Sequence, residues 1–165
     1  MIESFNRGQH RFPVSRYFED LTVGERFYIP SRTMTEAHFA AFQMLSGDNH
    51  PIHYDVEYCR ERGHPGALAH GFQILCFTAA GASSFALAVG DGLIAFVEQS
   101  SKFLRPVYPG DTLYPMLEIS ELKPQRSTGI VTLASTVHNH RDELVLTGEQ
   151  KILLRRRDSG SSGPR

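Results

Sequence analysis

Two short segments of this 165-residue chain contain the residue types that acid–base chemistry needs. The first reads LSGDNHPIH and holds Asp48 and His53 around a Gly/Pro turn. The second reads AHGFQ and places His70 and Gly71 at the start of an apolar run. A carboxylate and an imidazole can move protons to and from water, and the free amides of a helix start can receive a developing oxyanion. Together the segments predict a site that adds water.

Each of these residues also has a purely structural interpretation. Asp48 follows a glycine and could bond its own backbone in a turn, and His53 could be an ordinary surface or core histidine. Gly71 could begin a helix without binding anything, since glycine is acceptable at a helix start. The pairing of Asp48 with His53, followed by AHG, favours catalysis over these alternatives. For His70 we expect loop bracing rather than chemistry.

Charge and composition limit the partners that the chain could have. The 17 basic and 18 acidic residues nearly cancel, so no overall field would draw the protein to nucleic acid or to a membrane. No apolar stretch reaches the roughly 18 residues of a membrane span, and no signal-like run opens the chain. We therefore expect a cytoplasmic protein. Cys59 and Cys76 belong to no C-x-x-C pair, which predicts free thiols rather than a disulfide or a zinc site.

The first half of the chain carries helix signals. Residues 33–36 read TMTE, which matches a capping box in which a hydroxyl and a carboxylate satisfy free amides. The helix that follows would turn Phe39, Phe42 and Leu45 toward the core and stop at Gly47.

Two further helices are expected before the strands begin. A short one fits residues 55–62, with Asp55 as its cap and Gly63 as its terminator. The longest helix is expected near residues 67–85, with small residues on its other faces, and should be central. Its apolar positions recur at spacings of three and four: Leu68, Phe72, Leu75, Ala79 and Ala82.

Strand patterns dominate the second half of the chain. After a short strand over residues 25–29, strands are predicted at 93–99, 101–107, 112–122, 130–137 and 143–155. Pro115 indicates an edge position or a bulge. Helices followed by consecutive antiparallel strands predict an α+β fold in which a sheet wraps one central helix. We expect a single domain over residues 16–155, an N-terminal arm over residues 1–15 and a disordered tail over residues 156–165.

Several segments resemble one known family. SGDNHPIHYD, AHG and SKFLRPVYPGDTL, together with RYFEDLTVGERF at the start, are similar to the MaoC-like dehydratases, which include (R)-specific enoyl-CoA hydratases. The resemblance covers residues 16–154 and implies a hot-dog fold, an antiparallel sheet around a central helix. It also implies a homodimer or a multiple of dimers, in which a second copy covers strand edges and apolar flanks.

The resemblance further implies an activity: hydration of a 2-enoyl-CoA to a 3-hydroxyacyl-CoA, or the reverse dehydration. Asp48 and His53 would then activate water, and the Gly71 amide would donate to the thioester carbonyl. Histidine suits proton transfer near neutral pH because its ordinary pKa is about 6.5. The implied partner is an acyl-CoA thioester, and neither a metal nor an organic cofactor is expected.

The chain departs from the family pattern at two places. His50 stands where relatives have asparagine, with Asn49 shifted one position earlier, and Ala79 stands where hydratases of the family often carry a hydroxyl. His50 could tune Asp48, contact substrate or point to solvent. Because coenzyme A carries phosphates, a near-neutral protein needs local cations to bind it. The candidate substrate contacts are therefore Asn49, His50, His70, Lys102 and Arg105.

Alternative functions stay open at this point. The chain could be a hot-dog thioesterase, with water attacking the thioester carbonyl, or a non-catalytic subunit that binds acyl-CoA. A metal site built from Asp48 and the histidines His50, His53, His64 and His70 is disfavoured, because no H-E-x-x-H or cysteine pattern supports it. The acyl group could be a carboxylated chain, a medium-length chain or an aromatic intermediate.

Overall fold

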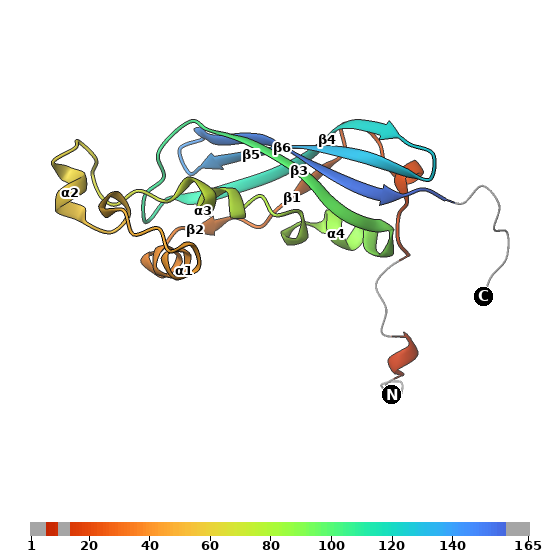
Figure 1. Cartoon of the computed structure of the whole chain (residues 1–165), viewed down its shortest axis with the longest axis horizontal. Coiled ribbons are helices and arrows are strands. Elements are labelled where there is room, and N and C mark those ends of the chain that lie inside the picture. The colour runs from red at the N-terminus through yellow and green to blue at the C-terminus, as the bar shows by residue number, and fades with distance from the viewer. Residues whose placement is uncertain (1–5, 10–13, 158–165) are drawn as a thin grey trace.

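The computed structural model of the chain describes residues 6–9 and 14–157. One antiparallel sheet carries short helices on one of its faces, as Figure 1 shows. The predicted α+β class, with an antiparallel sheet wrapped around a central helix, is confirmed. The arm predicted over residues 1–15 and the tail predicted over residues 156–165 lie largely outside the described residues.

The sheet has the strand order β1-β4-β5-β6-β3, and β2 pairs with β4 beside β1. The strands are β1 (Arg26–Tyr28), β2 (Arg32–Thr33), β3 (Leu93–Phe103), β4 (Thr112–Pro124), β5 (Thr128–Asn139) and β6 (Leu144–Arg155). Three long strands therefore form the middle of the sheet. The long strand β3 forms one edge, and two short strands share the other.

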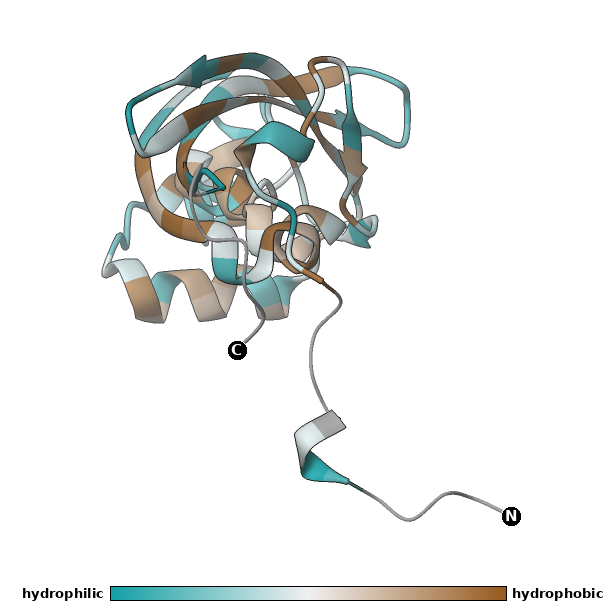
Figure 2. Ribbon diagram, turned by 90° about the vertical axis from the view of Figure 1, so that its right-hand side faces the viewer, coloured by the Kyte–Doolittle hydropathy of each residue, from teal (hydrophilic) through white to brown (hydrophobic). Residues whose placement is uncertain are grey.

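Alternation along the central strands creates one buried face. On β4, for example, Leu113, Leu117 and Ile119 are fully buried, and other positions stay partly exposed. This face packs on the helices in two groups of core residues, one around Phe85 and the other around Phe39. The end view in Figure 2 shows the sheet curving over these helices.

The helical layer consists of short elements. The α-helices are α1 (Glu36–Ser46), α2 (Val56–Arg60), α3 (Gly71–Cys76) and α4 (Ser84–Val89). Single 3-10 turns lie at Arg7–Gln9, Phe18–Asp20, Pro51–His53, Ala80–Ala82 and Gly90–Gly92. Within the described residues, no helix is long and apolar enough to cross a membrane.

The prediction that α1 ends at Gly47 is confirmed, whereas its predicted cap and part of its predicted buried face are wrong. Gly47 terminates the helix with φ of 69°, a left-handed conformation that glycine adopts without strain. The cap differs from the prediction, because the backbone N–H of Thr35 donates to Nδ1 of His38 (3.1 Å) rather than to a carboxylate. Phe39 is buried as expected, whereas Leu45 is 81% exposed. The apolar spacing therefore overestimated the buried face.

The short helix predicted over residues 55–62 is confirmed as α2. Asp55 caps it by accepting from the N–H of Tyr58 at 3.0 Å. Gly63 follows with φ of 79°, as a terminating glycine should. The chain segment that leaves α1 at Gly47 ends in this helix.

The single long helix predicted over residues 67–85 is wrong. The chain is extended up to His70, because the N–H of Ala69 donates to the carbonyl of Val107 (2.8 Å) instead of entering a helix. After α3, the hydroxyl of Thr78 donates to the carbonyl of Leu75 (2.8 Å), and Ser83 accepts from the N–H of Phe85 (3.1 Å) to start α4. Side-chain bonds to the backbone thus divide an alanine-rich stretch that periodicity alone joins.

The face predicted for that helix is also wrong. Phe72, expected in the core, is 70% exposed, and Gln73 and Ile74 are buried in its place. The helix begins four residues later than the pattern indicated, and its buried side is the one that carries Gln73 and Ile74.

Two strand predictions need correction. The separate strand expected at residues 101–107 is absent from the described chain, since β3 continues through Phe103 and the chain then leaves the sheet. Pro115 lies inside β4 opposite Val137, away from the register shift at Ile119/Glu121. Its carbonyl accepts from the N–H of Ile29 (3.2 Å), so its ring nitrogen faces the gap between β1 and β2. The missing N–H therefore leaves no ladder bond unpaired.

The break between α3 and α4 predicts unequal effects at two adjacent serines. Ser83→Ala removes the cap of α4 and should lower the free energy of unfolding by about 1 kcal/mol. Ser84→Ala, the matched control at the exposed next position, should change it by less than about 0.5 kcal/mol. Urea unfolding measures both. Equal stabilisation by the two alanines would indicate a continuous helix instead.

Candidate active site

Asp48 is held by the turn that leaves α1. Its own N–H donates to the hydroxyl of Ser46 (3.2 Å), and its Oδ1 accepts from the N–H of His50 (3.1 Å). Asp48 therefore bonds its own backbone, as the structural interpretation expected. That bond uses only Oδ1, and Oδ2 remains available for other partners.

His53 lies at the end of the next 3-10 turn and is fixed by the backbone of Leu68. The Nδ1–H of His53 donates to the Leu68 carbonyl at 2.7 Å, and the N–H of Leu68 donates to the carbonyl of Ile52 at 3.0 Å. Because a carbonyl only accepts, the proton of the neutral ring must sit on Nδ1. Nε2 is then unprotonated and can accept a proton, as a general base requires.

Burial affects the charge of this ring. Desolvation lowers the pKa of His53, and the nearby His70 ring lowers it further. The Leu68 carbonyl and the charge of Asp48 raise it without reversing the direction. His53 is therefore a neutral base over more of the pH range than an exposed histidine.

His70 packs directly on His53. The two rings are stacked with centroids 3.6 Å apart and an interplanar angle of 20°. His70 is 3% exposed, and its Nε2 lies 3.3 Å from the Asp48 carbonyl and 3.1 Å from the Tyr54 hydroxyl. Since the carbonyl accepts, Nε2 carries the proton and donates to it. His70 thus holds the backbone of Asp48 and one face of His53.

Tyr54 is a contributor that sequence reasoning missed. Its hydroxyl donates to the same Asp48 carbonyl at 3.1 Å. No motif or periodicity marks this tyrosine, because its role depends on how the turn folds back over His70. Its position directly after His53 was the only available signal.

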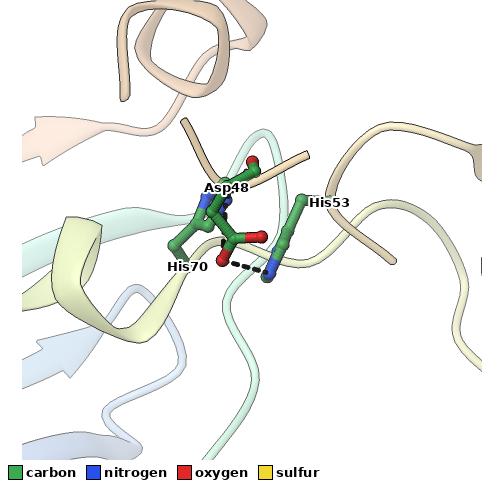
Figure 3. Close-up of side chains that lie close together, drawn as sticks. All are labelled: Asp48, His53 and His70. Carbon is green, nitrogen blue, oxygen red and sulfur yellow. Dashed lines mark hydrogen bonds and ion pairs between the residues drawn. The ribbon is translucent and has the colours of Figure 1, made fainter. Parts of the chain in front are cut away.

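Asp48, His53 and His70 form one cluster, drawn in Figure 3. Asp48 Oδ2 lies 3.9 Å from Nε2 of His53 and 3.7 Å from Nε2 of His70. Both distances exceed a direct hydrogen bond, but a water molecule can contact Oδ2 and Nε2 of His53 together. Asp48 is half exposed, so solvent reaches this point. The arrangement can hold water between a carboxylate and a base.

Gly71 begins α3 beside this cluster. As the first helical residue its N–H has no partner within the helix, and no hydrogen bond in the described part of the chain uses it. A Cβ at this position would lie 3.1 Å from ring atoms of Phe103, closer than most real contacts. Glycine therefore fits the space that β3 leaves. The helix has only six residues, so local amides rather than a long dipole must stabilise charge here.

The metal interpretation narrows to three residues. Ligand-type atoms of Asp48, His53 and His70 lie within 4.8 Å of one another, close enough to hold an ion. His50 and His64 do not join them, and Nδ1 of His64 instead lies 3.2 Å from the Tyr108 hydroxyl. A metal would have to displace the Nε2 proton that His70 donates to the Asp48 carbonyl.

The other candidate substrate contacts lie outside the cluster. His50 is exposed and its Nδ1 accepts from the N–H of Ile52 at 3.3 Å, so it stabilises the turn. Asn49 donates to the Gly47 carbonyl (3.2 Å) and accepts from Gln43. Lys102 and Arg105 are exposed, and Arg105 pairs with Glu143 at 3.7 Å. None of these contacts indicates that His50, Asn49, Lys102 or Arg105 binds a ligand.

The comparison with known proteins decides the family. Residues 20–140 match the model of the MaoC like domain, which is well over half of the chain. This chain belongs to the MaoC-like domain family. The resemblance seen in the sequence motifs is thereby confirmed.

Three relatives show how broad the similarity is. An (R)-specific enoyl-CoA hydratase of Rhodospirillum rubrum is 29% identical over 86% of this chain and 93% of its own length. The structure of a monoamine oxidase regulatory protein from Archaeoglobus fulgius matches with a TM-score of 0.81 and 32% identity, over 87% of this chain and 97% of that one. A Mycobacterium tuberculosis protein with a double hotdog fold matches with a TM-score of 0.73 and 30% identity, over 90% of this chain and 47% of that one. The hot-dog fold is confirmed.

The environment of His53 predicts a specific titration. Nitrogen NMR should find the neutral ring protonated on Nδ1 and its pKa below the ordinary value of about 6.5, because burial disfavours the charged form. Asp48→Asn removes a charge that raises this pKa, so the pKa should fall further. Asp91→Asn, an exposed carboxylate outside the cluster, is the control. A pKa that rises in Asp48→Asn would contradict the geometry.

Proposed function

We propose that this protein hydrates a 2-enoyl-CoA to a 3-hydroxyacyl-CoA, or dehydrates the product in reverse. The main support is one juxtaposition: Asp48 Oδ2 lies 3.9 Å from an Nε2 atom of His53 that its Leu68 contact leaves unprotonated. A carboxylate and a neutral base at this separation can share one water molecule. The name of the Rhodospirillum rubrum relative, an (R)-specific enoyl-CoA hydratase, supports the same reaction, and the (R) product rests on that likeness alone.

The reaction uses three groups of the site: the carboxylate of Asp48, the ring of His53 and the amide of Gly71. Water held by Asp48 gives a proton to Nε2 of His53 as its oxygen bonds to the β-carbon of the substrate. The electron pair of the double bond moves toward the thioester oxygen, which the free N–H of Gly71 stabilises. His53 and Asp48 then return a proton to the α-carbon, so that one water molecule is added in total. Asp48 also stabilises the protonated His53 ring through its charge.

His70 and Tyr54 act as positioning residues in this proposal. Both hold the carbonyl of Asp48. The His70 ring also stacks on one face of the His53 ring and so fixes its plane. No step requires a metal or an organic cofactor. The sequence made His70 a candidate substrate contact, but its burial favours a role in positioning Asp48 and His53 instead.

The catalytic pair is tested with an enoyl-CoA panel. Asp48→Asn and His53→Ala should each lower the hydration rate by roughly 10²- to 10⁴-fold, the usual contribution of general acid–base catalysis. Loss of the conjugated enoyl absorbance measures hydration. For the wild type, activity should fall on the acidic side with an apparent pKa below about 6.5, because the base must be neutral.

Controls separate this proposal from its alternatives. Asp91→Asn should keep wild-type activity, and a chelator should leave turnover unchanged. A thiol reagent detects hydrolysis, so release of thiol without loss of the double bond would indicate a thioesterase. Tight binding of thioesters without any turnover would indicate a non-catalytic subunit. Near-wild-type hydration by both variants would show that the pair is wrongly assigned.

We also propose that the protein is a homodimer, or a multiple of dimers, formed through β3. This strand is a long sheet edge, and five of its large apolar side chains are at least 43% exposed: Leu93, Ile94, Phe96, Val97 and Phe103. An edge of this length, with unpaired backbone and apolar side chains, favours pairing with another chain. Phe72, also exposed, lines the same pocket as Leu93 and Phe96 and would extend this surface.

The dimer predicts a concentration-dependent mass. Sedimentation should give about twice the 18.5 kDa of the chain, or a multiple of it, at micromolar concentration. Val97→Lys places a charge on the apolar edge and should shift the distribution toward monomer. Val23→Lys, another exposed valine outside β3, is the control and should not. A wild-type monomer at micromolar concentration would contradict the proposal.

A cytoplasmic location is proposed from the thiols. Cys59 and Cys76 are both free, and the buried Cys59 donates to the carbonyl of Ile52 at 3.0 Å. Thiols persist in reducing compartments, whereas oxidising ones favour disulfides. Acyl-CoA is the proposed partner, with no nucleic acid or membrane.

A further inference from the structure

One buried side chain beside the cluster lacks the partners that buried polar groups need. Gln73, on α3 two residues after Gly71, is 3% exposed, and neither Nε2 nor Oε1 has a hydrogen bond within the described residues. An unsatisfied buried polar group costs about 1–3 kcal/mol. A leucine would fill such a site without that cost. The amide therefore requires an explanation.

Gln73 lines a cavity between α1 and α3 of about 250 Å³. The walls are mostly apolar, with Phe42, Leu45 and Phe77 among them. The polar or charged side chains that line it are Gln73, Arg32 and His38, and no carboxylate does. Apolar walls with a few convergent polar groups are typical of a small-molecule site.

The polar groups offer donors and positive charge. Among the described residues no carboxylate pairs with Arg32, whose guanidinium lies 5.3 Å from the centre of the Phe77 ring. His38 accepts from the Thr35 N–H at Nδ1, so the proton of its neutral ring sits on Nε2. Gln73 adds two N–H donors on its amide nitrogen. This set suits an anionic acceptor.

The cavity begins next to the catalytic cluster. The ring of Phe42, which lines it, lies 4.9 Å from the ring of His70. Leu45, also a lining residue, is three residues before Asp48. From Leu45 the cavity follows α1 back to His38, about 10 Å of helix at 1.5 Å per residue. An acyl group whose thioester sits at the start of α3 could extend into it.

We propose that this cavity binds a carboxylate at the far end of the acyl group. The substrate class is then the CoA thioester of an unsaturated dicarboxylic acid rather than of a plain alkyl acid. Gln73 donates to the carboxylate, Arg32 supplies positive charge and the Nε2–H of His38 a further donor at the outer end, and the apolar walls contact the methylene groups. This inference rests on the proposed hydratase function and names its substrate.

The first test compares matched substrates. 2-Enoyl-CoA esters of five to eight carbons ending in a carboxylate are each paired with an analogue in which an isopropyl group replaces the carboxylate. The wild type should favour one carboxylated ester by roughly 10- to 100-fold in kcat/KM, the range for a hydrogen bond to a charged group. The preferred length reports the distance from the cluster to Gln73.

Variants test whether the preference for the carboxylated ester arises in this cavity. Gln73→Leu should abolish it, lowering kcat/KM for the carboxylated ester by roughly 10- to 100-fold and leaving the isopropyl analogue unchanged or improved. Arg32→Gln should cost only a few-fold, because its charge is exposed and screened. Arg26→Gln, whose side chain pairs with Glu118, is the matched control and should keep the preference. Thermal unfolding checks that each variant is folded.

Binding separates the two proposals. Calorimetry with saturated CoA esters of five to eight carbons, each paired with its isopropyl analogue, needs no turnover; glutaryl-CoA and 5-methylhexanoyl-CoA are the five-carbon pair. Tighter binding of one carboxylated ester that Gln73→Leu removes supports the carboxylate site even if no ester is hydrated, in which case only the hydratase proposal fails. Hydration without any carboxylate preference, or equal affinity within every saturated pair, overturns the carboxylate site and leaves the hydratase proposal standing.

Discussion

The candidate site depends on the two backbone bonds of a single residue. The carbonyl of Leu68 accepts from Nδ1–H of His53, and its N–H donates to the carbonyl of Ile52. The next residue, Ala69, bonds to Val107 and so ties this segment to the loop between β3 and β4. An extended stretch before α3 therefore holds the turn that carries Asp48 and His53. The bond from His53 to the Leu68 carbonyl also selects the tautomer of His53, so a structural contact leaves Nε2 able to accept a proton.

That extended stretch also explains why the helix begins where it does. If residues 67–70 were helical, the carbonyl of Leu68 would accept from the N–H of Phe72 inside the helix and could not hold His53. His70 would then lose its position under the cluster, because its stacking on His53 follows from the extended approach to α3. The late start of α3 is thus a condition of the site, and the free amide of Gly71 results from it.

Much of this arrangement could be predicted from the sequence, and the failures share a cause. Gly47, Asp55 and Gly63 were assigned correctly because caps and terminators depend on a few local residues. The helix over 67–85 was wrong because Ser83 and Thr78 divide it through side-chain bonds that periodicity does not register. The exposed Leu45 and Phe72 illustrate a second limit, since apolar spacing cannot tell a core face from an apolar surface.

The site itself was predictable in its parts but not in its assembly. The spacing of Asp48 and His53, with Gly71 starting a helix, pointed to the residues that the structure brings near one another. The stacking of His70 and the bond from Tyr54 needed the folded turn. Gln73 was hidden for another reason. A single polar residue in an apolar helix carries no motif, and its missing partners become visible only when its surroundings are known.

The two oxygens of Asp48 have separate duties, and this has an evolutionary consequence. Oδ1 closes the turn by accepting from His50, whereas Oδ2 faces the imidazoles. An asparagine would keep an acceptor for the turn and lose the charge, and one base change in the codon converts aspartate to asparagine. Under the proposed function, gene duplication followed by that single mutation would give a descendant that keeps the turn and loses the charge that activates water. The proposed enzyme therefore lies one nucleotide away from a ligand carrier or sensor.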